Sequence, residues 1–220
     1  HGIPFSRPMK IYAGEYSDIS DASIVIVSAG TGQKSGETRL DLVNKNVSIF
    51  KSIIPEVTKS GFAGILLIVS NPVDILTQAA IKISGFDKNR VIGSGTVLDS
   101  ARLKHQLGEH LAVDSRSVHA FIVGEHGDSE VVAWSSANVS GICLSDFCEM
   151  RGHFSHKEQT DEIALKVKNS AYEIIDRKKA TYYGIAMAVK RICEAIVRDE
   201  KSILPVSHMI DDVYGINDVV

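Results

Sequence analysis

A histidine between two glycines is the first residue in this sequence that could do chemistry. In the segment VGEHGD at 123–128, His126 follows an apolar run that predicts a strand, and the glycines leave space around its ring. A histidine titrates near neutral pH, so it can accept and donate a proton, as the oxidation of an alcohol and the reduction of a carbonyl require. Taken alone, the segment favours an ordinary surface or core histidine.

Asp99 and Arg102 form a second candidate pair in the segment LDSAR. Their spacing puts a carboxylate and a guanidinium on one face of a predicted helix. An aspartate can hold a histidine in one tautomer and stabilise its protonated form, and an arginine can bind a carboxylate with two hydrogen bonds. In isolation, the simpler interpretation is a surface ion pair worth less than about 1 kcal/mol.

Two loops that follow buried strands could bind ligands. The segment at 29–39 is rich in glycine and small polar residues, which is typical of a mobile lid or of an ordinary loop. Neither this segment nor Gly93-Ser94-Gly95 fits the G-x-G-x-x-G fingerprint of dinucleotide-binding turns. Asn71, in SNPVD, lies where open α/β sheets bind ligands, although Asn-Pro is also a common turn.

The elements that must position these residues alternate between strands and helices, which indicates a parallel α/β sheet. We predict strands at 9–12, 24–28, 65–70, 91–92 and 118–123, and helices at 40–57, 73–84, 98–110 and 156–197. The last helix is expected to break near Thr181, and 202–208 with 214–220 to form a hairpin. Without low-complexity linkers, a domain boundary near Gly93 must be a structural hinge.

The composition excludes some functions. A net charge of −3 with scattered charges gives no electrostatic case for nucleic acid or an anionic membrane, and the longest apolar stretches are far short of a membrane helix. The odd number of cysteines and the lack of a C-x-x-C pair fit a reducing cytoplasm. His153 and His156 lie in a polar loop without a third ligand, so no metal site is expected.

Five motifs together carry a family resemblance. In chain order, AG-x-x-QK-x-GETRLDL, SNPVD, IGSGT-x-LDSAR, GEHGD and ATYYGIA resemble the successive active-site motifs of L-lactate dehydrogenases of the lactate/malate dehydrogenase family, of bacterial type. The resemblance spans nearly the whole chain. It implies a Rossmann-type parallel sheet with an α+β substrate domain, divided as 1–93 and 94–220, and NAD-dependent interconversion of L-lactate and pyruvate.

The resemblance also implies a role for each catalytic residue. His126 would be the proton donor and acceptor, Asp99 its orienting carboxylate, and Arg102 the residue that binds the substrate carboxylate. Arg39, on the lid, would polarise the substrate carbonyl. Gln33 stands where malate dehydrogenases generally carry an arginine, so it favours pyruvate over a dicarboxylate.

Further residues would complete the pocket and the cofactor site. Asn71 would contact both nicotinamide and substrate, and Thr181 would form a wall of the substrate pocket. The remaining positions expected to line NAD are Tyr16, Gly30, Thr31, Ser52, Val69, Ser70 and Ser94.

The resemblance leaves regulation and some alternatives open. Many bacterial members are activated by fructose 1,6-bisphosphate at a subunit interface, where His119 matches the family's histidine but Lys104 replaces an arginine. A solvated lysine and a strand histidine are equally compatible with these two residues. A homotetramer is implied by the family alone. The alternatives are a malate or other 2-hydroxy-acid dehydrogenase, and a catalytically silent chain.

The resemblance is expected to extend beyond both ends of the chain. The G-x-G-x-x-G turn and the acidic residue that binds the adenosine ribose are expected before His1, and further strand and a helix after Val220. We therefore expect the intact parent chain to bind NAD and to catalyse the reaction.

Overall fold

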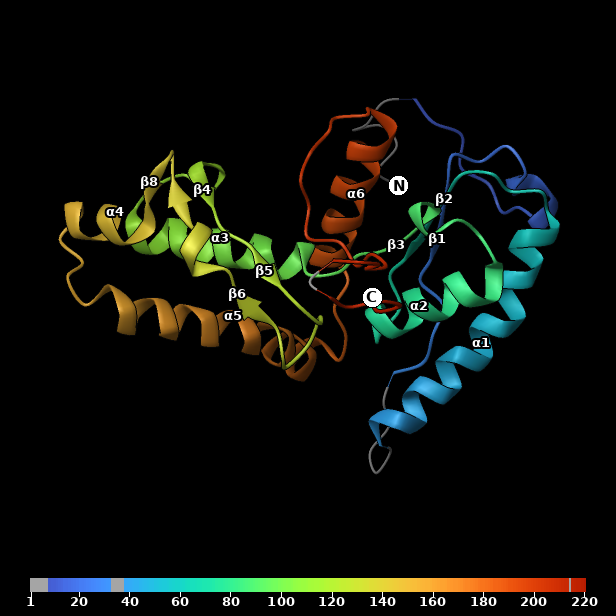
Figure 1. Ribbon diagram of the computed structural model, residues 1–220, viewed down its shortest axis with the longest axis horizontal. Coiled ribbons are helices and arrows are strands. Elements are labelled where there is room, and N and C mark those ends of the chain that lie inside the picture. The colour runs from blue at the N-terminus through green and yellow to red at the C-terminus, as the bar shows by residue number, and fades with distance from the viewer. Residues whose placement is uncertain (1–7, 33–37, 214) are drawn as a thin grey trace.

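In the computed structural model, the structure describes residues 8–32, 38–213 and 215–220. Figure 1 shows two groups of elements, one around a parallel sheet and the other around small antiparallel sheets. Among the described residues, no helix has the length and apolar character needed to cross a membrane.

The first group is built on a three-stranded sheet. It consists of β1 (Ile24–Val27), β2 (Ile65–Ile68) and β3 (Val91–Gly93), in that order and all parallel. Val25 faces Leu66 across the first pair of strands. The predicted parallel α/β sheet is confirmed.

Helices cover both faces of this sheet. Leu66 packs into a core with α1 (Arg39–Lys59) and α2 (Val73–Ser84), whereas its neighbour Leu67 packs against α6 (Tyr183–Val197) on the other face. Successive side chains of a strand point to opposite faces, so a central strand covered on both sides must be apolar throughout. Both leucines are fully buried, and burying each contributes about 1.5–3 kcal/mol.

Local signals explain where the helices begin and end. Thr38 caps α1, since its hydroxyl accepts a hydrogen bond from the Asp41 N–H at 3.1 Å and the Asp41 carboxylate accepts one from the Thr38 N–H at 3.0 Å. Gly85 ends α2 with a φ of 66°, a left-handed conformation that glycine adopts without strain. The predicted helix at 73–84 therefore has the observed bounds.

The second group packs around α3 (Val97–Leu111). Leu103, Leu107 and Leu111 recur every four residues on one face of this helix and are fully buried. They pack with α5 (His156–Lys178) and with two antiparallel sheets, of order β4-β7-β8 and β5-β6. The short elements are β4 (Val118–His119), β5 (Ile122–Val123), β6 (Val131–Val132), β7 (Asn138–Val139), β8 (Ile142–Cys143) and α4 (Leu144–Met150), with 3₁₀ turns at Tyr16–Ile19, Lys88–Arg90, Ser115–Ser117 and Trp134–Ser136.

Several predicted elements differ from the structure. The strand predicted at 9–12 is wrong, because these residues are exposed and no described strand pairs with them. The strand predicted at 118–123 is divided into β4 and β5, which pair with different partners. The predicted break near Thr181 is confirmed by the gap between α5 and α6.

The predicted C-terminal hairpin is also wrong in its pairing. Ser207 exchanges two backbone hydrogen bonds with Gly93, of 2.9 and 3.1 Å, and Val219 pairs with Ile210, which lies after the predicted first arm. A Cβ on Gly93 would lie 2.4 Å from the Thr77 hydroxyl and 2.8 Å from Ser207, so glycine permits this close approach. The unpaired edge of β3 thus binds a segment that local sequence assigns to a hairpin. The short strands and α4 at 131–150 were not predicted, since runs of two to seven residues carry little periodicity.

Candidate active site

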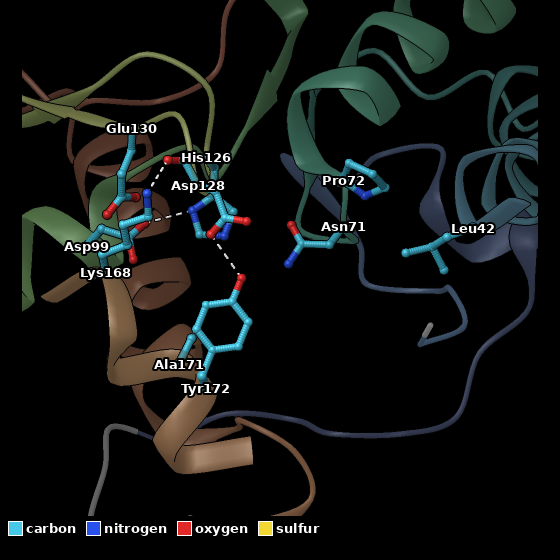
Figure 2. Close-up of a pocket in the computed structure, with 11 residues that line it drawn as sticks. Leu42, Asn71, Pro72, Asp99, His126, Asp128, Glu130, Lys168, Ala171 and Tyr172 are labelled. Atoms are coloured by element: carbon cyan, nitrogen blue, oxygen red, sulfur yellow. Dashed lines mark hydrogen bonds and ion pairs between the residues drawn. The ribbon is translucent and has the colours of Figure 1, made fainter. Parts of the chain in front are cut away.

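A pocket of about 390 Å³ lies between the two groups of elements. Its walls come from α1, the β2–α2 turn, α3, the β5–β6 loop and α5, and Figure 2 shows the side chains that line it. His126 and Asp99 come from the second group of elements, and Asn71 faces them from the first. The pocket therefore joins residues that are far apart in the sequence.

Two glycines shape the loop that carries His126. Gly124 and Gly127 have φ values of 88° and 151°, which residues other than glycine rarely adopt. The His126 backbone N–H donates a hydrogen bond to the Asp74 carboxylate at 2.8 Å, and the Ser207 hydroxyl donates to the same carboxylate at 2.5 Å. The first turn of α2 thus fixes the position of the loop.

A buried carboxylate orients the imidazole. The Asp99 side chain is 5% exposed and its Oδ2 lies 2.7 Å from His126 Nδ1, while its Oδ1 accepts a hydrogen bond of 3.1 Å from Arg102 Nη1. A carboxylate only accepts, so Nδ1 carries a hydrogen and Nε2 is left to exchange a proton with the pocket. The hydrogen bond to Asp99 raises the pKa of His126, against the opposing effect of burial.

Four residues of this pocket with polar or charged side chains, Asp128, Glu130, Lys168 and Tyr172, were missed by sequence reasoning. Glu130 has a pKa raised to about 7, first by burial and then by the Asp99 charge. On α5, Lys168 donates to the Asp128 carbonyl and the Tyr172 hydroxyl donates to the Asp128 carboxylate at 2.9 Å. The i,i+4 spacing of Lys168 and Tyr172 put both on one helix face, but nothing in the sequence indicated that this face meets a loop 40 residues earlier.

Asp99, His126 and Glu130 also form a compact cluster. One polar atom of each lies within 4.8 Å of the others, which is the spacing that a shared cation would need. Both Asp99 oxygens are already hydrogen-bonded, to Arg102 and to His126. The cluster therefore consists of the two interactions of Asp99, with His126 and with Arg102, and the Glu130 carboxyl group beside them.

The residues expected to line the cofactor gather at the carboxyl ends of the three parallel strands. Gly30 and Thr31 follow β1, Val69, Ser70 and Asn71 follow β2, and Ser94 follows β3. This edge is where open α/β sheets bind ligands.

Asn46 ties two of these turns together and was also missed. Its side chain is buried on α1, accepts a hydrogen bond from the Thr31 N–H at 2.8 Å and donates one to the Asn71 carbonyl at 2.8 Å. A polar residue within the apolar pattern of a helix is the signal that could have identified it.

Two other cofactor candidates lie apart from these turns. Tyr16 borders a groove of about 480 Å³ along β1. Ser52 is exposed on α1, where its hydroxyl donates to the Ile49 carbonyl.

The remaining candidates lie outside this arrangement. Gln33 is outside the described residues, and only the backbone of Arg39, at the start of α1, is described. Thr181 lies between α5 and α6 and does not line the described pocket. Lys104 is partly buried on α3 with its ammonium 5.1 Å from the centre of the Phe121 ring, and His119 is exposed on β4. Burial lowers the pKa of Lys104.

Comparison with known proteins decides the family. The model of the lactate/malate dehydrogenase NAD-binding domain matches residues 1–93, and that of the lactate/malate dehydrogenase alpha/beta C-terminal domain matches residues 96–220. The chain belongs to the lactate/malate dehydrogenase family. The predicted α/β fold class, a Rossmann-type parallel sheet with an α+β substrate domain, is confirmed, and the cofactor is NAD.

Two curated relatives match this chain over its full length. The L-lactate dehydrogenase of Acetivibrio thermocellus is 54% identical over 219 residues, which are 100% of this chain and 69% of that protein. L-lactate dehydrogenase 1 of Clostridium acetobutylicum is 52% identical, with 70% of its length covered.

Solved structures give the same result. A lactate dehydrogenase from a Medee basin deep-sea metagenome library has a TM-score of 0.95 at 50% identity, with 100% of this chain and 70% of that one covered. The ligand-bound minor L-lactate dehydrogenase of Enterococcus mundtii has a TM-score of 0.93 at 47% identity, with 99% and 69% covered.

Proposed function

We propose that this chain interconverts L-lactate and pyruvate with NAD, with His126 as the proton donor and acceptor. The observation that carries the proposal is the imidazole in the pocket, held by a buried carboxylate at 2.7 Å and facing Asn71 across the cavity. The family and the names of relatives at about 50% identity support this reaction.

The residues present fit the cofactor. The turns that follow β1, β2 and β3 offer backbone N–H groups and small side chains, and the Asn71 amide reaches the same pocket as His126. NAD held by these turns would supply the hydride acceptor for lactate oxidation and, in its reduced form, the hydride donor for pyruvate reduction.

The pocket residues carry out the proton transfer. In pyruvate reduction, protonated His126 gives its Nε2 proton to the carbonyl oxygen, and Asp99 stabilises the imidazolium beforehand. In lactate oxidation, the neutral ring takes the hydroxyl proton. Arg102 would bind the substrate carboxylate, and Arg39 would steady the charge that develops on the carbonyl oxygen.

Substrate choice rests on Gln33. A neutral amide suits the methyl end of pyruvate, whereas an arginine would pair with a second carboxylate. We expect the purified intact parent protein to oxidise NADH with pyruvate far faster than with oxaloacetate, as followed by absorbance. The opposite preference would favour the alternative function, a malate dehydrogenase.

The role of His126 has a direct test. In His126→Ala, turnover of pyruvate should be lost while NADH binding, read by fluorescence, persists. Retained turnover would exclude the proposed mechanism. If the unmodified protein binds NADH but turns over neither pyruvate nor oxaloacetate, the second alternative, a catalytically silent chain, would be preferred.

Regulation and assembly are further parts of the proposal. We place fructose 1,6-bisphosphate activation at Lys104 and His119 in a homotetramer, and the three free cysteines fit a cytoplasmic location. If the effector binds there, it should lower the KM for pyruvate, and Lys104→Ala should remove this response. Light scattering should give the mass of four chains.

A further inference from the structure

Glu130 lies in the active-site pocket without a role in the proton transfer described above. It precedes β6 and lines the same cavity as His126 and Asp99. Its carboxylate belongs to the cluster in which one polar atom of each residue lies within 4.8 Å of the others. The pocket thus places a second carboxylate beside an imidazole that already has one.

Charged groups from each surrounding element face Glu130. Asp99 and Arg102 approach from α3, His126 from its own loop, and Lys168 from α5. Burial and the Asp99 charge raise the pKa of Glu130, and the three cations lower it by less, so it titrates at about 7. The groups that act on His126 are Asp99, Glu130 and Asp74, and all three carboxylates favour its protonated form.

The two neighbouring groups must therefore titrate together. An ionised carboxylate within about 5 Å of an imidazolium stabilises it, and the protonated imidazole in turn favours ionisation of the carboxylate. As pH rises through 7, Glu130 gains its charge while the reaction still needs a proton on His126. The ionised Glu130 carboxylate therefore shifts the loss of the His126 proton to higher pH.

We propose that Glu130 is a positioning residue for the proton on His126: its ionised carboxylate, together with Asp99, keeps the imidazole protonated and extends pyruvate reduction to higher pH. The catalytic part of this inference rests on the proposed function. The charge coupling between the two side chains does not.

The test replaces Glu130 by glutamine, which keeps the shape and removes the charge. In Glu130→Gln, the alkaline limb of kcat/KM for pyruvate should move to lower pH by about half a pH unit or more. Glu130→Asp, which keeps a carboxylate, should move it less. Glu149→Gln removes an exposed charge on α4, outside the pocket, and should leave the limb in place.

A second measurement does not depend on turnover. In NMR titrations of the protein without substrate, the His126 ring signals should show two inflections, one of them from Glu130, and Glu130→Gln should reduce them to a single inflection at lower pH. If Glu130→Gln does not fold, a single inflection in the unmodified protein would overturn the proposal, and two would support it.

The outcomes separate the two proposals. An unmoved alkaline limb together with an unmoved His126 titration in Glu130→Gln would overturn the role of Glu130, and so would an equal shift in Glu149→Gln. If the NMR coupling is present but pyruvate is not reduced, the proposed function fails and the coupling of the two side chains stands.

Discussion

Replacement of Asp99 by asparagine tests the reasoning on the active site most directly. The carboxylate is 5% exposed and accepts hydrogen bonds from His126 Nδ1 at 2.7 Å and from Arg102 at 3.1 Å. If the asparagine oxygen keeps the Arg102 bond, its NH₂ group faces Nδ1. The imidazole then loses the partner of its Nδ1 hydrogen and is pushed toward the wrong tautomer.

The size of the effect follows from the lost bond. A hydrogen bond to a charged group contributes about 1.5–3 kcal/mol, which corresponds to a fall of about 10- to 150-fold in kcat/KM for pyruvate. The pKa of His126 should also fall, because the hydrogen bond to Asp99 is the main cause of its upward shift. The alkaline limb of the pH profile should therefore move to lower pH.

Steady-state oxidation of NADH with pyruvate, measured across pH, checks this prediction. Asp146→Asn, an exposed change on α4, serves as the matched control and should behave like the unmodified protein. NADH binding should be unchanged in Asp99→Asn, since Asp99 does not lie at the strand ends. Unchanged kcat/KM in Asp99→Asn would refute the assignment, and so would a loss of NADH binding as large as the loss of rate.

Three other changes have defined outcomes. Asp74→Ala removes the partner of the His126 N–H and should lower kcat/KM for pyruvate by about 5- to 150-fold, which corresponds to about 1–3 kcal/mol. Ser207→Ala spares that bond and should have a smaller effect in the same assay; equal losses would count against the role of Asp74. Asn46→Leu leaves the Thr31 N–H and the Asn71 carbonyl without their hydrogen-bond partner. The KM for NADH should rise and the Tm, measured by calorimetry, should fall by several °C; an unchanged KM for NADH would contradict this. The pKa of Glu130 rises from 4.5 to about 7 on folding. The folded protein therefore loses stability as pH rises from 4.5 to about 7, and the loss is complete above that range. Glu130→Gln should raise the Tm at pH 8 by about 2–4 °C, with little change at pH 4.5; no difference between the two pH values would disprove this.

Much of the fold could be predicted because its signals are local. The helix at 73–84 has its observed bounds since apolar spacing and Gly85 act within a few residues. The apolar run of β2 indicated a strand covered on both faces. The strand predicted at 9–12 shows the limit, because β propensity cannot supply a partner strand.

The sequence alone determined which residue types were present for chemistry and, by their order, the family. It could not show that His126 and Asp99, 27 residues apart, meet at 2.7 Å, nor that Asp74 holds the loop from another helix. Tertiary structure decided those contacts, and with them the pKa of Glu130 and His126. The physical reason is that periodicity and capping act within one element, whereas burial and charge at a site depend on elements brought together only when the core packs.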